Sequence, residues 1–422
     1  MNQPMASREH LTAAEAARAL GVSAATLYAY VSRGLIRSEP SADARRTRLY
    51  RREDIELLNS RKQARRNPIQ AAERNLSWGL PVLESALTLI SEGRLYYRGH
   101  EATGLAAART VEEVASLIWE GEFRTDYRGL FEMAATRLKD SPVLRVKLPN
   151  LSPLERFRAI LALAEGENIA AYNLDPAALL ETGARIVVLL TQAAAPRTRW
   201  REGMARTLQS AWAPGDRRAE QLIRAALIML VDHELAVSSF TARCVASAGS
   251  PLYAVVEAGL CALRGIKHGG ATERAEQFLR EAASARSLRK LIGDRLRRGD
   301  HIPGFGHMLY PDGDPRARFL LEMLSRDYAN SPAASLARAI MKEARRVSER
   351  MRPNIDFAGA VLALTLALPA GSAVAIFALG RTIGWIGHAI EQYQIDRLIR
   401  PRARYVGPPP PGAAAIGPQK SP

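Results

Sequence analysis

The stretch HIPGFGHMLYPDGDPRARF (residues 301–319) decides how the rest of this 422-residue chain is interpreted. It holds three glycines, three prolines and two histidines, and Arg316 follows an Asp-Pro step. Glycine and proline at this density predict a loop with a defined backbone path. Loops on a rigid scaffold are where proteins often present their chemistry. The stretch therefore raises the question of what His307 and Arg316 are held against.

The chain around this loop is predicted to be all-α. From about residue 76 onward, Ala- and Leu-rich segments are broken by glycine, proline and asparagine, and alternating β-branched runs are rare. Residues 357–380 form an uncharged run of 24 residues, which is long enough to cross a membrane. Pro369 and Gly371 divide the run into two shorter pieces, the length of buried core helices. We therefore expect two core helices here and no membrane association.

Composition limits the class of protein. Two cysteines provide neither a disulfide framework nor a cysteine-rich zinc site. The first residues are polar and no apolar segment follows them, so we expect a soluble cytoplasmic protein. The formal net charge is +16, of which residues 1–66 contribute 13 Lys and Arg less 7 Asp and Glu, or +6. Such a charge favours anionic partners, although a solvated arginine-rich surface would give the same balance.

The N-terminal segment LTAAEAARALGVSAATLYAYVSRGLI (residues 11–36) predicts two short helices. Thr12 and Glu15 have the spacing of a capping box, and a glycine ends the first helix before Ser23 caps the second. A helix, a glycine-centred turn and a capped second helix are typical of a helix-turn-helix. With the basic segment that follows, residues 10–58 resemble the MerR/excisionase type of winged helix-turn-helix.

Duplex DNA is the partner that this resemblance implies. In such motifs the second helix enters the major groove and basic residues around it bind phosphates. The phosphate-binding residues we predict are Arg33, Arg45, Arg46, Arg48, Arg51 and Arg52. The alternative is a module that docks on a protein or dimerises.

Four residues in the rest of the chain have settings suited to acid–base chemistry. His233 lies between an aspartate and a glutamate, and His268 lies at a glycine-rich break. His307 follows PGFG, and Asp356 stands at the mouth of an apolar helix, where burial could tune a base. A single histidine is more often structural than catalytic, so their combination matters more than any one. His301 and His307 are six residues apart on a loop, which is weak evidence for zinc, and we predict no metal site.

These residues lie in segments that together resemble the citrate synthase family. The segments are DHELAVSSFTARCVAS, LYAVVEAGLCALRGIKHGGATE, HIPGFGHMLYPDGDPRA, RPNIDF, GRTIGWIGHAIEQ and RPRARYVGP. The resemblance covers about residues 76–407, in order and with family-like spacing. It implies an all-α fold with a large and a small helical domain behind the helix-turn-helix. The expected divisions are a winged helix-turn-helix at 1–60, a linker at 61–75, a large domain at 76–268 and 371–407, a small domain at 269–370, and a Pro-rich tail at 408–422.

The resemblance also implies a reaction, in which acetyl-CoA condenses with oxaloacetate to give citrate and CoA as in the tricarboxylic acid cycle. Asp356 then takes the methyl proton, His268 stabilises the enol, and His307 polarises the ketone. The implied oxaloacetate-binding residues are His233, Arg316, Arg381 and Arg400. Arg400 is expected to reach into the partner subunit's site in a homodimer. Acetyl-CoA is a substrate here, and no cofactor is implied.

Three departures from the family pattern leave the acyl substrate open. Pro311 stands where lysine is common, and residues 358–360 are Ala-Gly-Ala where tyrosine or serine is common. Ala236 and Val237 stand where the family usually has Asn-Ala. Small side chains behind the base could admit propionyl-CoA and give 2-methylcitrate. A further alternative is a DNA-binding regulator that uses this fold as a metabolite sensor.

Overall fold

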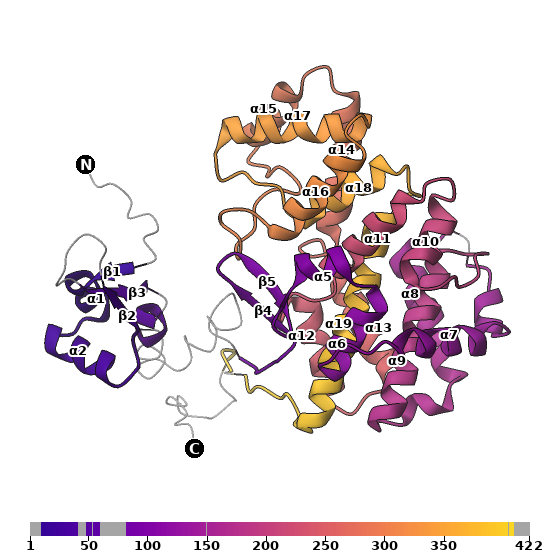
Figure 1. Cartoon of the computed structure of the whole chain (residues 1–422), viewed down its shortest axis with the longest axis horizontal. Helices are drawn as coiled ribbons and strands as arrows, with labels where there is room; N and C mark the ends of the chain where they lie inside the picture. Colours follow the sequence, from indigo (N-terminus) through magenta and orange to yellow (C-terminus); the bar gives the residue numbers. More distant parts are fainter. Residues whose placement is uncertain are drawn as a thin grey trace. The chain divides into compact units, whose positions relative to one another are not determined.

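The structure is a computed structural model that describes residues 10–40, 48–52, 54–59, 82–148, 150–403 and 405–408. The chain divides into two compact units, Met1–Glu84 and Ser85–Pro422, which are described separately (Figure 1). The predicted linker at 61–75 and nearly all of the predicted tail fall outside the described residues.

The first unit is a winged helix-turn-helix. Its elements are β1 (His10–Thr12), α1 (Ala13–Leu20), α2 (Ala24–Ser32), β2 (Ser38–Pro40) and β3 (Arg48–Arg51). Residues 54–59 form a further helical turn, and the strands make an antiparallel sheet in the order β1-β3-β2. The predicted helix-turn-helix is therefore confirmed.

Local signals explain where these helices begin and end. Thr12 and Glu15 form the predicted capping box at α1, and Gly21 ends the helix with φ +60°, a left-handed conformation that favours glycine. The Ser23 hydroxyl accepts the Thr26 amide proton at 3.2 Å and starts α2. The two helices and the sheet enclose a small core of Leu11, Ala16, Leu20, Leu27, Ile36, Tyr50 and Ile55.

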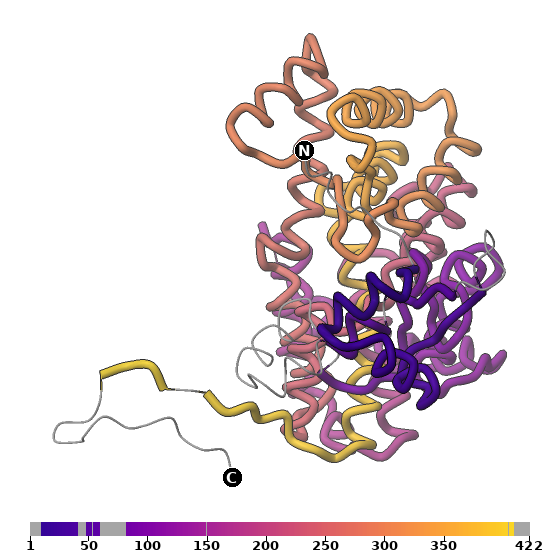
Figure 2. The backbone as a smooth tube through the Cα atoms, turned by 90° about the vertical axis from the view of Figure 1, so that its left-hand side faces the viewer, coloured from indigo at the N-terminus to yellow at the C-terminus, as the bar shows by residue number. Residues whose placement is uncertain are grey.

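The second unit is mostly helical, which confirms the predicted fold class. Its helices are α5 (Ala102–Ala108), α6 (Val111–Glu120), α7 (Tyr127–Leu138), α8 (Pro153–Gly166), α9 (Pro176–Ala194), α10 (Met204–Trp212), α11 (Arg218–Met229), α12 (Val237–Ala246), α13 (Leu252–Leu263), α14 (Gly270–Ser284), α15 (Leu288–Arg297), α16 (Pro315–Asp327), α17 (Pro332–Val347), α18 (Ile355–Thr365) and α19 (Ser372–Ile395), with short 3₁₀ turns η1 (Pro142–Arg145) and η2 (Ile169–Tyr172). Three short strands that the sequence analysis did not predict, β4 (Thr88–Ser91), β5 (Arg94–Tyr97) and β6 (His100–Glu101), form an antiparallel sheet. In Figures 1 and 2 the orange segments α14–α18 lie at one end of this unit.

Helix α19 is the buried centre of the second unit, and its sequence shows why. A Cβ at Gly380 would lie 2.5 Å from the Leu227 carbonyl oxygen, and one at Gly384 would lie 2.2 Å from the Val231 oxygen. Only glycine allows this contact between the α19 backbone and the end of α11. The two glycines therefore bring α19 against residues 227–232, next to the candidate site.

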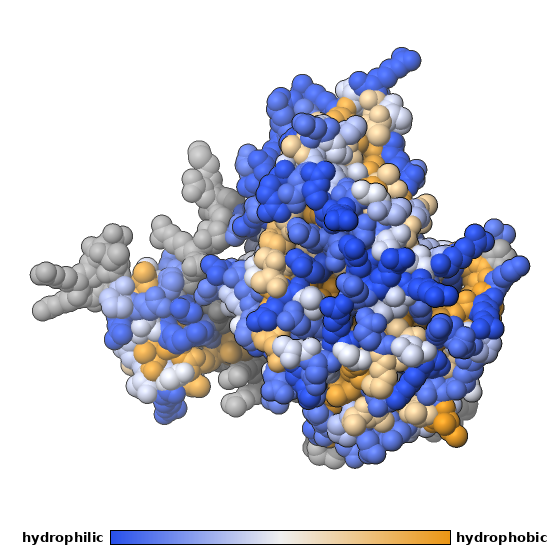
Figure 3. Space-filling view, turned by 45° about the vertical axis from the view of Figure 1, so that its right-hand side comes forward, coloured by the Kyte–Doolittle hydropathy of each residue, from blue (hydrophilic) through white to orange (hydrophobic). Residues whose placement is uncertain are grey.

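Among the described residues, two helices, α9 and α19, are long and apolar enough to cross a membrane, but both are mostly buried, as core helices are. The most apolar window of α19 is wholly buried, and 61% of that of α9 is buried. The predicted break in the 357–380 run is confirmed, since α18 ends at Thr365 and α19 begins at Ser372. Hydrophilic residues cover most of the face shown in Figure 3, with apolar residues in separate small areas.

Candidate active site

The 301–314 loop is held against the start of α18 by its glycines. Gly304, at φ +82°, lies so close to Phe357 that an added Cβ would be 2.7 Å from the Phe357 Cβ. The Gly304 carbonyl accepts the Asn354 amide proton at 2.8 Å, and the Gly306 amide donates to the Arg352 carbonyl at 2.8 Å. The loop that carries His307 is thereby fixed to the helix that carries Asp356.

His233 and His307 meet edge to face, with ring centroids 5.2 Å apart. The His307 Nδ1 accepts the Leu309 amide proton at 3.2 Å, which leaves the ring proton on Nε2. Burial, reinforced by Arg316, lowers the pKa of His307 to about 4, so the ring is a neutral donor at pH 7. Burial also lowers the pKa of His233 well below its usual value, and its Nε2 is 3.0 Å from the Tyr310 hydroxyl.

His268 lies in the tight turn between α13 and α14. The Gly269 amide donates to the Leu263 carbonyl at 2.8 Å, and a Cβ at Gly269 would lie 2.5 Å from that oxygen, so the turn requires glycine. The His268 Nε2 is 2.8 Å from the buried Ser238 hydroxyl. Burial, followed by the nearby Arg381 charge, lowers the pKa of His268 to about 4, so this imidazole is also neutral.

Asp356 is placed by the cap of α18. The Asn354 side chain accepts the Asp356 amide proton at 3.1 Å and starts the helix. The Thr272 hydroxyl donates to Asp356 Oδ1 at 2.5 Å. Burial raises the pKa of Asp356, and the Thr272 hydrogen bond opposes part of that rise. The result is a carboxylate more basic than an exposed aspartate.

Arg316 is buried and already paired with Asp314. Its Nε and one Nη each donate to an Asp314 oxygen at 2.9 Å, a two-point fork. Asp314 also accepts the Ile355 amide proton at 3.0 Å, which ties α16 to α18. Burial lowers the pKa of Arg316, but the Asp314 charge outweighs it and raises the pKa overall. The other Nη of Arg316 makes no hydrogen bond to any residue that the structure describes.

Arg381 is a buried guanidinium with an unused N–H group. Its Nε donates to the Leu230 carbonyl at 2.9 Å, and the guanidinium lies 4.9 Å from the Phe377 ring centroid. One Nη is buried and has no hydrogen-bond partner among the described residues. Such a group costs free energy unless a hydrogen-bond acceptor, such as a carboxylate oxygen, binds it.

A cavity of about 210 Å³ lies beside His307. It is lined by Gly306, His307, Tyr310, Pro311, Gly313, Asp314, Arg350, Arg352 and Pro353. Pro311, one of the departures from the family pattern, belongs to this lining, together with two arginines that favour an anionic ligand. In the part of the chain that the structure describes, no group of three or more His, Cys, Asp or Glu could hold a metal ion.

The remaining predicted residues lie elsewhere in the chain. Arg400 is exposed beyond the end of α19. Arg45 and Arg46 lie outside the described residues, and the other predicted phosphate-binding residues, Arg33, Arg48, Arg51 and Arg52, belong to the first unit. Two of these already have carboxylate neighbours within that unit, because Arg51 lies 3.2 Å from Glu39 and Arg52 lies 3.8 Å from Glu56.

Sequence reasoning missed four side chains that hold the predicted residues in place, namely Ser238, Thr272, Tyr310 and Asp314. Asp314 had a readable signal, because an aspartate before a proline that opens a helix is a typical N-cap. The other three become partners only when segments distant in the sequence pack together.

Comparison with known proteins places the chain in a family. Residues 76–402 match the family described as citrate synthase, C-terminal domain, and residues 11–58 match the helix-turn-helix domain. The chain belongs to the citrate synthase family.

Individual citrate synthases agree with this placement. The chain is 30% identical to citrate synthase 2 of Bacillus subtilis, over 78% of this chain and 95% of that protein. It is 32% identical to the citrate synthase of Haloferax volcanii, over 78% and 94%. A solved citrate synthase from Thermoplasma acidophilum, in a ternary complex with carboxymethyl coenzyme A and oxaloacetate, superposes with a TM-score of 0.70 at 25% identity, covering 82% of this chain and 98% of that one. The similarity thus extends through the whole helical unit of this citrate synthase family member.

Proposed function

We propose that this protein condenses acetyl-CoA with oxaloacetate to give citrate and CoA. One observation carries the proposal: neutral imidazoles and a carboxylate of raised pKa accompany a buried guanidinium with an unpaired N–H. A metabolite sensor would need the cationic groups to bind a dicarboxylate, but it would not need a tuned base.

The first step is removal of a proton from the thioester methyl group. This group is a very weak carbon acid, so a base must act while a donor shares the negative charge that develops on the thioester oxygen. Asp356 is the base, and its raised pKa suits it to accept the proton. His268 is the donor, since a Ser238 hydroxyl that donates to Nε2 leaves the ring proton on Nδ1.

The second step is attack of the enol carbon on the ketone of oxaloacetate, which forms the new carbon–carbon bond of a citryl thioester; water then hydrolyses that thioester to give citrate and free CoA. His307 carries its proton on Nε2 and donates it as a hydrogen bond to the ketone oxygen. Arg316 and Arg381 each retain an N–H group for a carboxylate, and His233 completes the oxaloacetate site. Fixing both carboxylates sets the direction of attack.

The working unit that we propose is a cytoplasmic homodimer. Arg400 is exposed in its own subunit, and we assign it to a substrate carboxylate in the partner's site. The small domain, residues 269–370, closes over the bound substrates because the enol must be kept from water.

Propionyl-CoA is a second candidate substrate, on the evidence of Gly359. This residue lies one helical turn after Asp356, and a Cβ added to it meets no atom within 4 Å. Space near the base can accommodate the extra methylene of propionyl-CoA, and the product is then 2-methylcitrate. One extra methylene changes the discrimination by about 10- to 200-fold, so both thioesters should be compared as kcat/KM.

The first unit is proposed to bind duplex DNA. Arg33 and Arg48 are exposed, and Tyr28 on α2 is 55% exposed and free to contact a groove. Fluorescence anisotropy with the full chain should show binding that weakens as salt increases, by a log–log slope of roughly −0.9 for each phosphate contact. Arg33→Gln with Arg48→Gln should reduce that slope, while Arg137→Gln, an exposed charge in the second unit, should not. A full chain that binds no duplex at low salt would favour the docking alternative.

The condensation itself is tested by oxaloacetate-dependent release of the CoA thiol, with acetyl-CoA and propionyl-CoA assayed in parallel. Release with either thioester supports the enzyme. Binding of oxaloacetate without release from either would favour the regulator that senses metabolites.

A further inference from the structure

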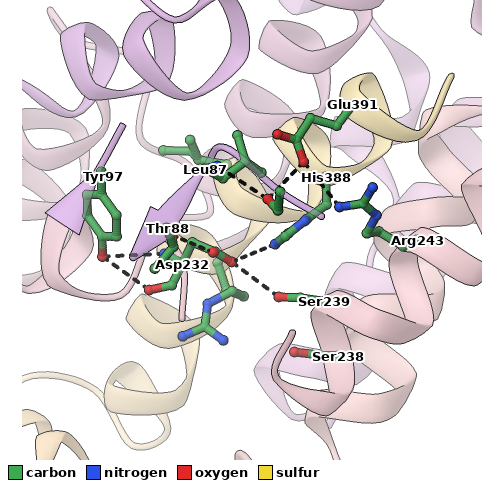
Figure 4. Close-up of polar contacts among 12 residues, drawn as sticks. Leu87, Thr88, Tyr97, Asp232, Ser238, Ser239, Arg243, His388 and Glu391 are labelled. Atoms are coloured by element: carbon green, nitrogen blue, oxygen red, sulfur yellow. Dashed lines mark hydrogen bonds and ion pairs between the residues drawn. The ribbon is translucent and has the colours of Figure 1, made fainter. Parts of the chain in front are cut away.

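Asp232 is a wholly buried carboxylate that does not face the cavity but holds three donors (Figure 4). The Thr88 hydroxyl donates to Oδ2 at 2.6 Å, the Ser239 hydroxyl to Oδ1 at 3.2 Å, and His388 Nε2 to Oδ1 at 3.2 Å. The donors come from β4, α12 and α19, so one carboxylate joins three elements to the segment before α12. A buried carboxylate with this many donors is a fixed structural centre.

The charge state of this centre follows from its contacts. Burial alone would raise the pKa of Asp232, but His388 and Arg381 outweigh it and the pKa is lowered, so Asp232 is ionised. His388 is itself wholly buried, and its Nδ1 has no partner among the described residues. With a proton on Nε2, the His388 ring donates a hydrogen bond to Asp232 Oδ1.

Asp232 also stands between two groups assigned to oxaloacetate. It directly precedes His233, and it is two residues after Leu230, whose carbonyl accepts the Arg381 Nε proton. Gly384 lies one turn beyond Arg381 on α19, and a Cβ there would be 3.1 Å from Asp232 Oδ1. The carboxylate is thus pressed against the α19 backbone between Arg381 and His388.

The contacts of Asp232 fix the backbone as well as the side chains. The Tyr97 hydroxyl donates to the Ile228 carbonyl at 3.0 Å and lies 3.3 Å from the Asp232 carbonyl oxygen. The 228–233 segment is therefore held by hydrogen bonds from two elements, from Tyr97 on β5 and from Arg381 and His388 on α19. A shift of Asp232 would move His233 and the carbonyl that orients Arg381 together.

We propose that His388 is a positioning residue for the oxaloacetate site. Through its hydrogen bond to Asp232 it holds His233 and Arg381 at the spacing that the substrate carboxylates require. This inference rests on the proposed function, because it needs oxaloacetate as the ligand. His388 touches no substrate, and its influence passes entirely through Asp232.

The test compares two substitutions that differ in one property. His388→Phe keeps a ring of similar size but removes the donor, whereas His388→Gln keeps an N–H that can reach Asp232. The expected result for His388→Phe is a rise in the KM and the calorimetric Kd for oxaloacetate of about tenfold or more, with kcat and the KM for acetyl-CoA changed far less. His388→Gln should restore both constants to within about threefold of the parent. The control is Thr191→Val, which removes a buried hydroxyl bonded only within α9 and should change neither constant.

A different pattern of changes in kcat, KM and Kd would overturn the proposal. If His388→Phe lowers stability or kcat but leaves the oxaloacetate constants unchanged, His388 is merely a packing residue. If His388→Phe does not fold, Thr88→Val serves instead, since it removes one donor of Asp232 without changing shape. It should raise the Kd for oxaloacetate by about threefold or more, and an unchanged Kd would overturn the proposal equally. A parent protein that neither binds oxaloacetate nor releases thiol would overturn the proposed function and this inference with it. An active parent with an unchanged variant would overturn this inference alone.

Discussion

Replacing Asp356 by asparagine separates the base from the rest of the site. Asparagine keeps the shape, and its amide oxygen can still accept the Thr272 hydroxyl proton that Asp356 accepts at 2.5 Å. The Asn354 cap of α18 bonds the backbone amides of residues 356 and 357 and is unaffected by the change. The site should therefore fold and bind oxaloacetate almost as the parent does. What is lost is the atom that takes the methyl proton.

The magnitude follows from that single loss. Removal of a general base typically costs about 10²- to 10⁴-fold in rate, which corresponds to roughly 3 to 5 kcal/mol of the activation barrier. We expect kcat for thiol release to fall within that range, with the calorimetric Kd for oxaloacetate within about threefold of the parent. Asp140→Asn, at an exposed carboxylate paired with Arg145, makes the same chemical change outside the site and should leave both values unchanged. A variant at position 356 with parental kcat would refute the assignment of the base.

Three further predictions follow from contacts and charges. Thr272→Val removes the hydrogen bond that lowers the pKa of Asp356, so the acid limb of the pH profile of kcat/KM should move to higher pH. An acid limb that stays in place would show that Thr272 does not influence the pKa of the catalytic base. His268 and His307 have folded pKa values of about 4 against an ordinary value of 6.5, so the unfolded chain binds more protons between these limits. The thermal midpoint should therefore fall as pH decreases from 6.5 towards 4, as measured by differential scanning calorimetry. The double substitution His268→Gln with His307→Gln should make the midpoint less dependent on pH. An unchanged dependence would show that other groups cause it. Arg400→Gln should raise the KM for oxaloacetate while leaving the dimer intact by light scattering, and an active monomer would remove the reason for that assignment.

Much of the helical architecture was predictable because its signals are local. The Thr12–Glu15 spacing and Gly21 predict the ends of the first helix, and the structure shows the capping box and the left-handed turn. The Pro369–Gly371 break predicts the division between α18 and α19. The three short strands of the second unit escaped notice because none is longer than four residues, too short for an alternating pattern.

The site was less predictable, because its partners are set by packing. Arg316 was expected to face a substrate, but its fork is bound to Asp314 two residues earlier. Thr272 reaches Asp356 across 84 positions of sequence, and nothing local indicates such a contact. In the first unit, Arg51 was expected to bind phosphate, yet it lies beside Glu39 on the neighbouring strand. Charge and motif identify which residue types matter, whereas their pairing depends on which elements meet.

Condensation requires a new carbon–carbon bond between the acyl methyl carbon and the ketone carbon of oxaloacetate. The most direct measurement supplies acetyl-CoA labelled with ¹³C at the methyl carbon together with oxaloacetate, and follows the products by NMR and the free thiol by absorbance. We expect the parent protein to form labelled citrate and free CoA in equal amounts, and Asp356→Asn to reduce the rate of both by about 10²-fold or more. Free CoA without labelled citrate, or bound oxaloacetate with neither product, would show that the protein does not catalyse the condensation.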